Sequence, residues 1–229
     1  MPAAVRIWDL PTRLFHWLLA ACVTGALVTV KLGGMYMDWH VRFGLATFGL
    51  ILFRLLWGLF GPRYARFAQF VRGPGAWWRY LRGQAPEGQA GHNPLGALSV
   101  VAMLALFGLQ AGTGLFANDD ILTQGPLAHR ISGELSSRLT GLHMQAEWLL
   151  YALVALHLAA VAWYALVRRK RLVGPMIHGD APAAELAPGT PAAEDGLAVR
   201  LRALALAAAV AALLAWIDAQ QAGAAGMYY

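Results

Sequence analysis

The sequence contains seven histidines, and four of them lie in or beside long apolar segments. Ionisable side chains inside a membrane are costly and usually functional. His143 and His157 are fourteen residues apart. Fourteen helical residues turn through about 1400°, close to four full turns, so both imidazoles project from one face at a rise of roughly 21 Å. Because neutral imidazole is a common metal ligand, this spacing indicates two ligand sites at different depths of a bilayer core about 30 Å thick.

The composition indicates an integral membrane protein. Charged residues make up 13% of the chain, about half of the share usual in soluble domains. The net charge of +6 comes from basic residues that flank apolar segments, so we expect membrane lipid and no nucleic acid as a partner. The single cysteine, Cys22, excludes an intramolecular disulfide, a cysteine-based zinc or iron–sulfur site, and covalently attached c-type haem.

Long apolar runs predict the membrane spans, which need about 20 residues each as helix. The predicted spans are Leu14–Val30, Phe43–Phe60, Leu95–Phe116, Trp148–Val167 and the shorter Ala203–Ile217. We interpret the first as a span and not a signal peptide, because it contains His16 and Trp17. The expected fold is an all-α membrane protein, with a four-helix core in residues 1–172, a flexible cytoplasmic linker in 173–197, and an additional helix with a short tail in 198–229. The last helix could instead lie on the surface or against a partner.

Loop charges predict the orientation. Five arginines lie between Arg63 and Arg82, and the fourth span ends in the basic run Arg168–Arg171. Few basic residues lie near the opposite span ends, and acidic residues offset them. Since basic loops stay cytoplasmic, we expect a multi-pass protein of the bacterial inner membrane with its N-terminus in the cytoplasm.

This orientation sorts the four histidines into two pairs at matching depths. His40 and His143 fall near the outer face, whereas His16 and His157 fall near the inner face. Histidine at both axial positions makes a six-coordinate haem suited to electron transfer. We therefore predict a four-helix transmembrane di-haem bundle plus a C-terminal fifth helix. Single interfacial histidines, a proton relay or a bound metal such as zinc are the alternatives, and they would fit a haem-free anchor or transporter.

Three motifs carry a resemblance to a known family: Trp8–His16 (WDLPTRLFH), Phe53–Gly58 (FRLLWG) and Gly91–Gly96 (GHNPLG). Together with the His143–His157 spacing, they resemble the bacterial cytochrome b561 and nickel-hydrogenase cytochrome b family from about Val5 to Arg171. The resemblance implies a four-helix di-haem subunit that passes electrons between a partner redox protein and the quinone pool. The linker, the fifth helix and the long loop 118–141 depart from the family pattern, which leaves the electron donor open.

Two arginines are candidates for the haem propionates, which are anionic. Arg13 lies three residues before His16, on the same helical face. Arg54 lies within a span, where a propionate or an acidic partner would balance its charge. Alternatively, Arg54 could extend to water at the cytoplasmic interface.

His92 and Asn93 are candidates for binding a quinone head group. Related formate dehydrogenase gamma subunits bind a quinone analogue through an asparagine in the loop that opens the third core helix, and Asn93 is the matching position. His157 matches the neighbouring haem ligand. Alternatively, Asn93 could cap the helix that begins at Pro94. We expect His129 and His178 to be exposed.

Small and polar residues in the spans have two possible uses. The glycines could admit a porphyrin or could permit close helix packing; they are Gly25, Gly44, Gly49, Gly112 and Gly114. We interpret Gln110 and Thr113 as hydrogen-bonding residues between helices.

We hypothesise transmembrane electron transfer through two haem b groups, with quinone as an exchangeable substrate. The partner would be a periplasmic cytochrome c or a dehydrogenase or hydrogenase subunit, and the chain the cytochrome b subunit of an oxidoreductase complex. Whether it is an enzyme by itself stays open. The alternative is a stand-alone superoxide:quinone oxidoreductase, in which Lys31, Arg130 and Arg138 would attract the anion, although Asp119 and Asp120 oppose them.

Overall fold

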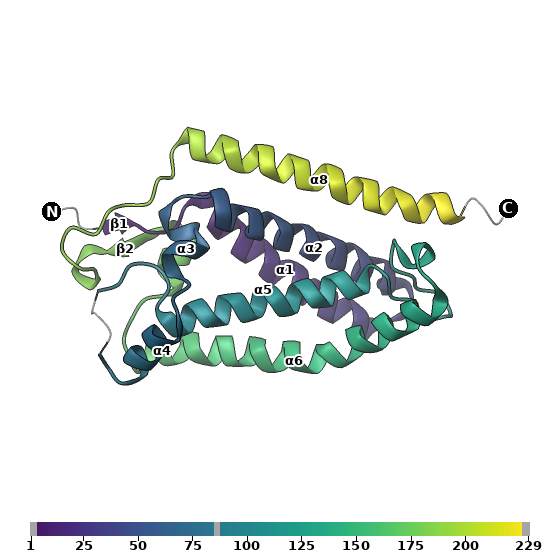
Figure 1. Ribbon diagram of the computed structural model, residues 1–229, viewed down its shortest axis with the longest axis horizontal. Coiled ribbons are helices and arrows are strands. Elements are labelled where there is room, and N and C mark those ends of the chain that lie inside the picture. Colours follow the sequence, from purple (N-terminus) through teal and green to yellow (C-terminus); the bar gives the residue numbers. More distant parts are fainter. Residues whose placement is uncertain (1–3, 85–87, 226–229) are drawn as a thin grey trace. The chain divides into compact units, whose positions relative to one another are not determined.

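The computed structural model describes residues 4–84 and 88–225, most of them in helices. Within these residues, five helices are long and apolar enough to cross a membrane (Figure 1). They are α1 (Leu10–Leu32), α2 (Met37–Phe60), α5 (Pro94–Gly114), α6 (Gly133–Leu166) and α8 (Leu197–Ala225). The predicted class, an all-α membrane protein, is confirmed. The end of the predicted tail, 226–229, lies outside the described residues.

The helix that carries His143 and His157 is longer than its apolar core. The sequence predicts a loop to residue 141, but α6 already begins at Gly133. Ser132 supports this start, because its hydroxyl accepts a hydrogen bond from the backbone N–H of Leu135 at 3.3 Å. The Ser136 hydroxyl donates to the carbonyl of Phe116 at 2.8 Å. Polar first turns do not register in a search for apolar runs, which explains the difference.

Short elements connect the long helices. The connections contain α3 (Phe67–Phe70), the 3-10 turns η1 (Gly34–Tyr36), η2 (Arg63–Ala65) and η3 (Ala128–Arg130), and α4 (Pro74–Leu81). The helix α4 contains the aromatic residues Trp77 and Trp78.

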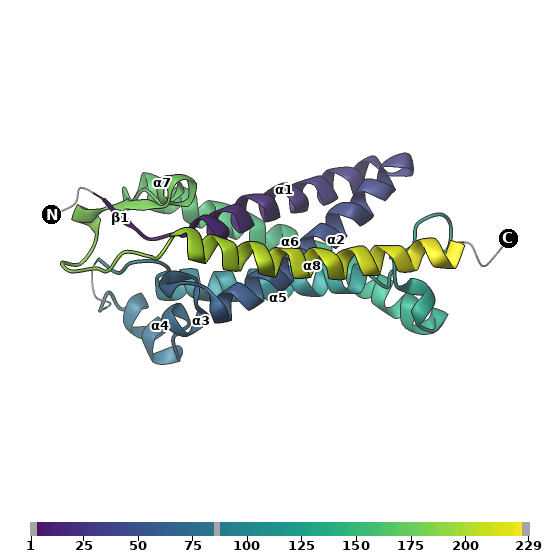
Figure 2. The same cartoon turned by 90° about the horizontal axis from the view of Figure 1, so that it is seen from above.

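The segment after α6 has defined structure where the sequence predicts a flexible linker. It forms α7 (Val173–His178), the strand β2 (Asp180–Pro182) and the 3-10 turn η4 (Ala183–Glu185). The strand β2 pairs antiparallel with β1 (Ala4–Arg6), with Arg6 opposite Asp180 (Figure 2). The backbone N–H of Ala193 also donates to the carbonyl of Arg6 at 2.7 Å. This pairing joins residues about 175 positions apart, so local composition does not reveal it.

The chain forms two compact units. The first unit contains Met1–His16, Arg54–Met103 and Val154–Leu204, and the second contains Trp17–Phe53, Leu104–Leu153 and Ala205–Tyr229. The side chains of Trp57 and Ile7 are buried in the first unit, and those of Ile51 and Phe107 in the second. His16 and His157 fall in the first unit, whereas His40 and His143 fall in the second.

Candidate haem sites

His40, on α2, and His143, on α6, face each other in the second unit. Their ring centres are 6.1 Å apart and their planes are inclined at 83°. Nδ1 of His40 lies 2.9 Å from the carbonyl oxygen of Ala26, and Nδ1 of His143 lies 2.8 Å from that of Gln110. A carbonyl oxygen can only accept a hydrogen bond, so each Nδ1 carries the proton. Nε2 of both rings therefore carries no proton, and that of His143 lies 3.4 Å from the amide nitrogen of Gln110.

The separation of these two ring centres matches that of two imidazoles on opposite sides of one metal ion. Two opposed metal–nitrogen bonds of about 2 Å each, plus roughly 1 Å from each nitrogen to its ring centre, require a separation of about 6 Å. The rings border a cavity lined by side chains of four helices, most of them apolar, including Val23, Phe107 and Leu150. A b haem is flat and mostly apolar, so the donor pair and the lining both suit it.

The glycines of the second unit divide between the two predicted uses. A side chain at Gly25 would meet the ring of Phe43 at 2.7 Å, and one at Gly49 would meet Leu214 at 2.4 Å. These two glycines therefore permit close packing. A Cβ at Gly44, which lines the cavity, would meet nothing within 4 Å. Gly44 thus leaves open space beside the histidine pair.

Polar side chains of α5 hold His143 in place. The amide nitrogen of Gln110 donates to the carbonyl of His143 at 3.0 Å, and the hydroxyl of Thr113 lies 3.3 Å from Nδ1 of His143. The predicted hydrogen bonding between helices is confirmed for both residues. Bonds of this kind fix the orientation of a metal-binding ring.

His16, on α1, and His157, on α6, form the corresponding pair in the first unit. Their ring centres are 6.5 Å apart and their planes are inclined at 52°. Both side chains are half-buried. The separation again matches the roughly 6 Å that a metal between two imidazoles requires. The structure thus brings together the pairs that the sequence predicts.

The two candidate propionate ligands have different surroundings, both within the first unit. Arg13 donates to the carbonyl of Ile177 at 2.6 Å and lies 3.8 Å from the carboxylate of Asp195. Arg54 is only 2% exposed, so its predicted extension to water is wrong. Its Cζ lies 4.8 Å from the ring centre of Phe67. The enclosed Arg54 is therefore the stronger candidate.

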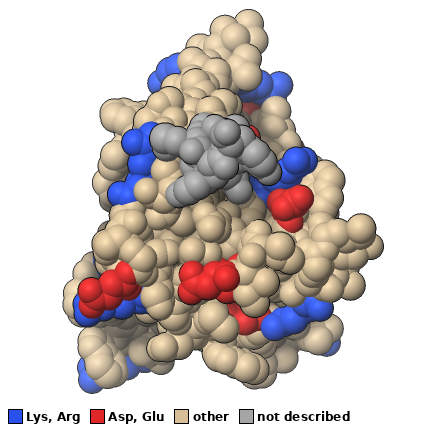
Figure 3. Space-filling model, turned by 90° about the vertical axis from the view of Figure 1, so that its right-hand side faces the viewer, with Lys and Arg blue, Asp and Glu red and all other residues tan. Residues whose placement is uncertain are grey.

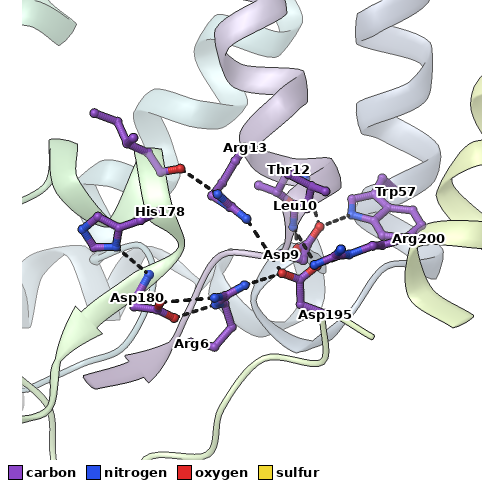
Figure 4. A network of polar contacts seen from close by, with 11 residues as sticks. Arg6, Asp9, Leu10, Thr12, Arg13, Trp57, His178, Asp180, Asp195 and Arg200 are labelled. Atoms are coloured by element: carbon purple, nitrogen blue, oxygen red, sulfur yellow. Dashed lines mark hydrogen bonds and ion pairs between the residues drawn. The ribbon is translucent and has the colours of Figure 1, made fainter. Parts of the chain in front are cut away.

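Asp9 is a site residue that the sequence interpretation missed. It is fully buried, directly before α1. Its carboxylate accepts hydrogen bonds from the Thr12 backbone N–H at 2.9 Å, the Thr12 hydroxyl at 2.8 Å and the Trp57 indole N–H at 3.0 Å (Figure 4). Burial raises the pKa of Asp9, although these hydrogen bonds oppose the shift. These bonds cap α1 and connect the motif that contains Asp9 with the motif that contains Trp57. The sequence signal for this cap is an acidic residue directly before a helix that starts with Leu-Pro.

A second carboxylate, Asp195, anchors the same helix start. It lies 2.5 Å from Nη1 of Arg6 and accepts the backbone N–H of Leu10 at 3.0 Å (Figure 4). Arg200 lies 3.5 Å from it, and Asp180 accepts from Nε of Arg6 at 2.6 Å. Burial alone would raise the pKa of Asp195, but its hydrogen bonds outweigh burial and lower the pKa. The segment after α6 therefore holds the beginning of α1.

His92 and Asn93 lie in the first unit but face different neighbours. The His92 ring lies between Trp8 and Phe70, at centre distances of 4.8 and 4.7 Å. The side-chain oxygen of Asn93 accepts the backbone N–H of Gly96 at 2.8 Å, so Asn93 caps α5 as one interpretation predicts.

The amide nitrogen of Asn93 has a second role. It donates to the hydroxyl of Tyr164 at 2.8 Å, and Tyr164 in turn shares a hydrogen bond with Tyr80 of α4. Burial, with the neighbouring Tyr164, raises the pKa of Tyr80 to about 12. Asn93 therefore belongs to a polar cluster with the hydroxyls of Tyr164 and Tyr80.

Comparison with known proteins identifies the family. Residues 7–179 match the family described as prokaryotic cytochrome b561, which is well over half of the chain. The chain belongs to the prokaryotic cytochrome b561 family. It is therefore a multi-pass membrane cytochrome with haem b that serves transmembrane electron transfer. The predicted resemblance is confirmed, and the haem-free alternative is not supported.

Individual relatives of this b561-family cytochrome are probable Ni/Fe-hydrogenase B-type cytochrome subunits. The protein of Azotobacter chroococcum is 28% identical, over 77% of this chain and 88% of its own length. That of Rhodobacter capsulatus is 22% identical, over 77% and 80%. The probable Ni/Fe-hydrogenase 1 B-type cytochrome subunit of Escherichia coli K12 is 21% identical, over 76% and 88%.

The surface of this cytochrome gives no support to a superoxide funnel. Figure 3 shows acidic and basic side chains next to each other on the face that it views. Lys31 lies 2.7 Å from Glu147, and Arg138 lies 2.6 Å from Glu134, so two of the three basic candidates are ion-paired. The third, Arg130, donates to the side-chain oxygen of Gln220. Among the predicted surface histidines, His129 is exposed, as is His178.

Proposed function

We propose that this cytochrome transfers electrons between a periplasmic redox partner and the quinone pool through two b haems. One haem would lie between His40 and His143, and the other between His16 and His157. The observation that carries the proposal is that two histidine pairs, at ring separations of 6.1 and 6.5 Å, come from helices of a b-type cytochrome. Haem b with two axial histidines supplies a one-electron couple and leaves no open position for dioxygen.

The surrounding chain orients the histidine rings. The carbonyls of Ala26 and Gln110 fix the rings of the second-unit pair, so little rearrangement accompanies a change of charge. The loop charges support an inner-membrane location with a cytoplasmic N-terminus, which puts the His16/His157 pair near the cytoplasmic face. Residues 1–172 would then form the haem-binding core, joined by 173–197 to a further spanning helix.

The partners follow from chemistry and from the relatives. Since the relatives are named as hydrogenase cytochrome subunits, we favour a hydrogenase over a cytochrome c as the periplasmic partner. Asn93 and Tyr164 offer an amide and a hydroxyl, which are suitable donors to a quinone oxygen. Quinone would therefore react beside the His16/His157 pair.

The test replaces His143 with alanine and counts haem. We expect His143→Ala to retain one haem b per chain and to lose quinone reduction by the periplasmic donor. His129→Ala, which removes an exposed histidine, is the matched control and should keep both haems and full activity. If His143→Ala kept both haems and full activity, the proposal would fail.

A further inference from the structure

Arg54 is a buried cation that contacts no carboxylate of the described residues. Its side chain is 2% exposed, and its Nη1 is shielded from solvent without a hydrogen-bond partner in the described chain. No ion pair joins it to a carboxylate of the described residues. Asp9 attracts the Arg54 charge but lies beyond ion-pair distance, and its oxygens accept hydrogen bonds from Thr12 and Trp57 instead. A buried charge that is not ion-paired is destabilising, so this arrangement points to an anionic ligand.

A second buried polar atom without a partner lies in the same cluster. Nδ1 of His92 is shielded from solvent and forms no hydrogen bond within the described residues. The ring of Phe70 lies 4.7 Å from the His92 ring and 6.0 Å from Cζ of Arg54. Burial lowers the pKa of His92 to about 3, with smaller contributions from Arg54 and His16. His92 is therefore a neutral imidazole, which offers one N–H donor.

The aromatic walls restrict what the ligand can be. The rings of Phe15, Phe67 and Phe70 lie 4.8 to 6.0 Å from the Arg54 guanidinium. Phe15 directly precedes His16 in α1. Such walls disfavour a free hydrated anion and favour a carboxylate that is attached to an apolar group. A haem propionate has this chemistry.

We propose that Arg54 and His92 together bind a propionate of the haem held by His16 and His157. The inference rests on the proposed function and reassigns His92 from quinone to haem, while Asn93 with Tyr164 remains the quinone candidate. Arg54 supplies the charge and His92 a hydrogen bond. Arg13 is the weaker candidate, because the Ile177 carbonyl accepts from it and Asp195 balances its charge, although its Nε also has no hydrogen-bond partner in the described residues.

The test measures the rate at which haem leaves the holoprotein for excess apomyoglobin. Loss of a charge-assisted hydrogen bond corresponds to roughly tenfold or more in the rate of haem release. We therefore expect Arg54→Gln to lose one of its two haems at least about tenfold faster, and His92→Phe to lose the same haem faster by a smaller factor. Arg13→Gln is the matched control and should release haem within about twofold of the wild-type rate.

Haem dimethyl ester, whose propionates are esterified, separates this role from a structural one. In protein loaded with the ester, Arg54→Gln and the wild type should release haem at rates within about twofold of each other. A difference as large as that with native haem would overturn the propionate site, as would equal rates of Arg54→Gln and wild type with native haem. If the glutamine variant does not fold, His92→Phe provides the same comparison between native and esterified haem. If His157→Ala kept as many haems as the wild type, the proposed function itself would be contradicted.

Discussion

Replacing Asp9 with alanine should loosen the start of α1, the helix that carries His16. The Asp9 carboxylate is fully buried and accepts three hydrogen bonds, two from Thr12 and one from the Trp57 indole. Loss of an N-cap costs about 1 kcal/mol. A buried indole N–H left without an acceptor costs a further 1–3 kcal/mol, roughly.

The net effect is smaller than the sum, because alanine also removes the cost of burying a carboxylate, which is seen in the raised pKa of Asp9. We expect a loss of about 2–3 kcal/mol in the free energy of local opening. This corresponds to hydrogen exchange roughly 30–150-fold faster. Asp9→Asn retains an oxygen that can accept from Trp57, so it should show a much smaller change.

Hydrogen–deuterium exchange of the peptide that covers residues 5–16, measured by mass spectrometry in detergent, tests this expectation. A distant peptide, such as one from the middle of α5, is the internal control. Exchange of Asp9→Ala at the wild-type rate would refute the reasoning. Equal acceleration in Asp9→Ala and Asp9→Asn would show that the charge, and not the cap and the indole bond, is what matters.

Three further predictions concern the other sites. Gly44→Leu fills open space beside the His40/His143 pair, so we expect a folded protein that binds one haem fewer. Pyridine haemochrome absorbance measures the haem content, and two haems in this variant would contradict the assignment of the cavity. Asn93→Ser can still cap α5 but loses the amide donor, so the KM for quinone should rise by about tenfold with an unchanged haem spectrum, and an unchanged KM would speak against Asn93 as a quinone ligand. The pKa of Asp195 is lowered, so its stabilisation is present above its unfolded pKa of 3.8 and is lost as the pH falls through the lower folded value. The melting temperatures of the wild type and Asp195→Asn should therefore differ near neutral pH and converge in the acid range, and a constant difference would exclude this carboxylate as the cause.

The histidine pairs were predictable because they depend on simple rules. Helical periodicity puts His143 and His157 on one face, and the loop charges decide which end of each span faces the cytoplasm. These two inferences are enough to pair His40 with His143 and His16 with His157, as the structure does. The spans were equally accessible, since long apolar runs have few alternatives to helix in a membrane.

The contacts that support the pairs were not predictable in the same way. Asp9 meets Trp57 across 48 positions, and Asp195 meets Arg6 across 189. Such contacts depend on how the segment after α6 folds, and its alanine- and proline-rich composition gives no local signal of a strand. The burial of Arg54 depends on Phe67 and Phe70 of α3, a helix of four residues that is too short to leave a periodic pattern.

The haem b content of the purified protein tests the central claim most directly. Pyridine haemochrome absorbance, divided by the polypeptide concentration from amino-acid analysis, gives the number of haems per chain. Two histidine pairs at ring separations of 6.1 and 6.5 Å predict two haem b per chain, falling to one in either His143→Ala or His157→Ala. A value of one or none in the wild-type protein would contradict the account.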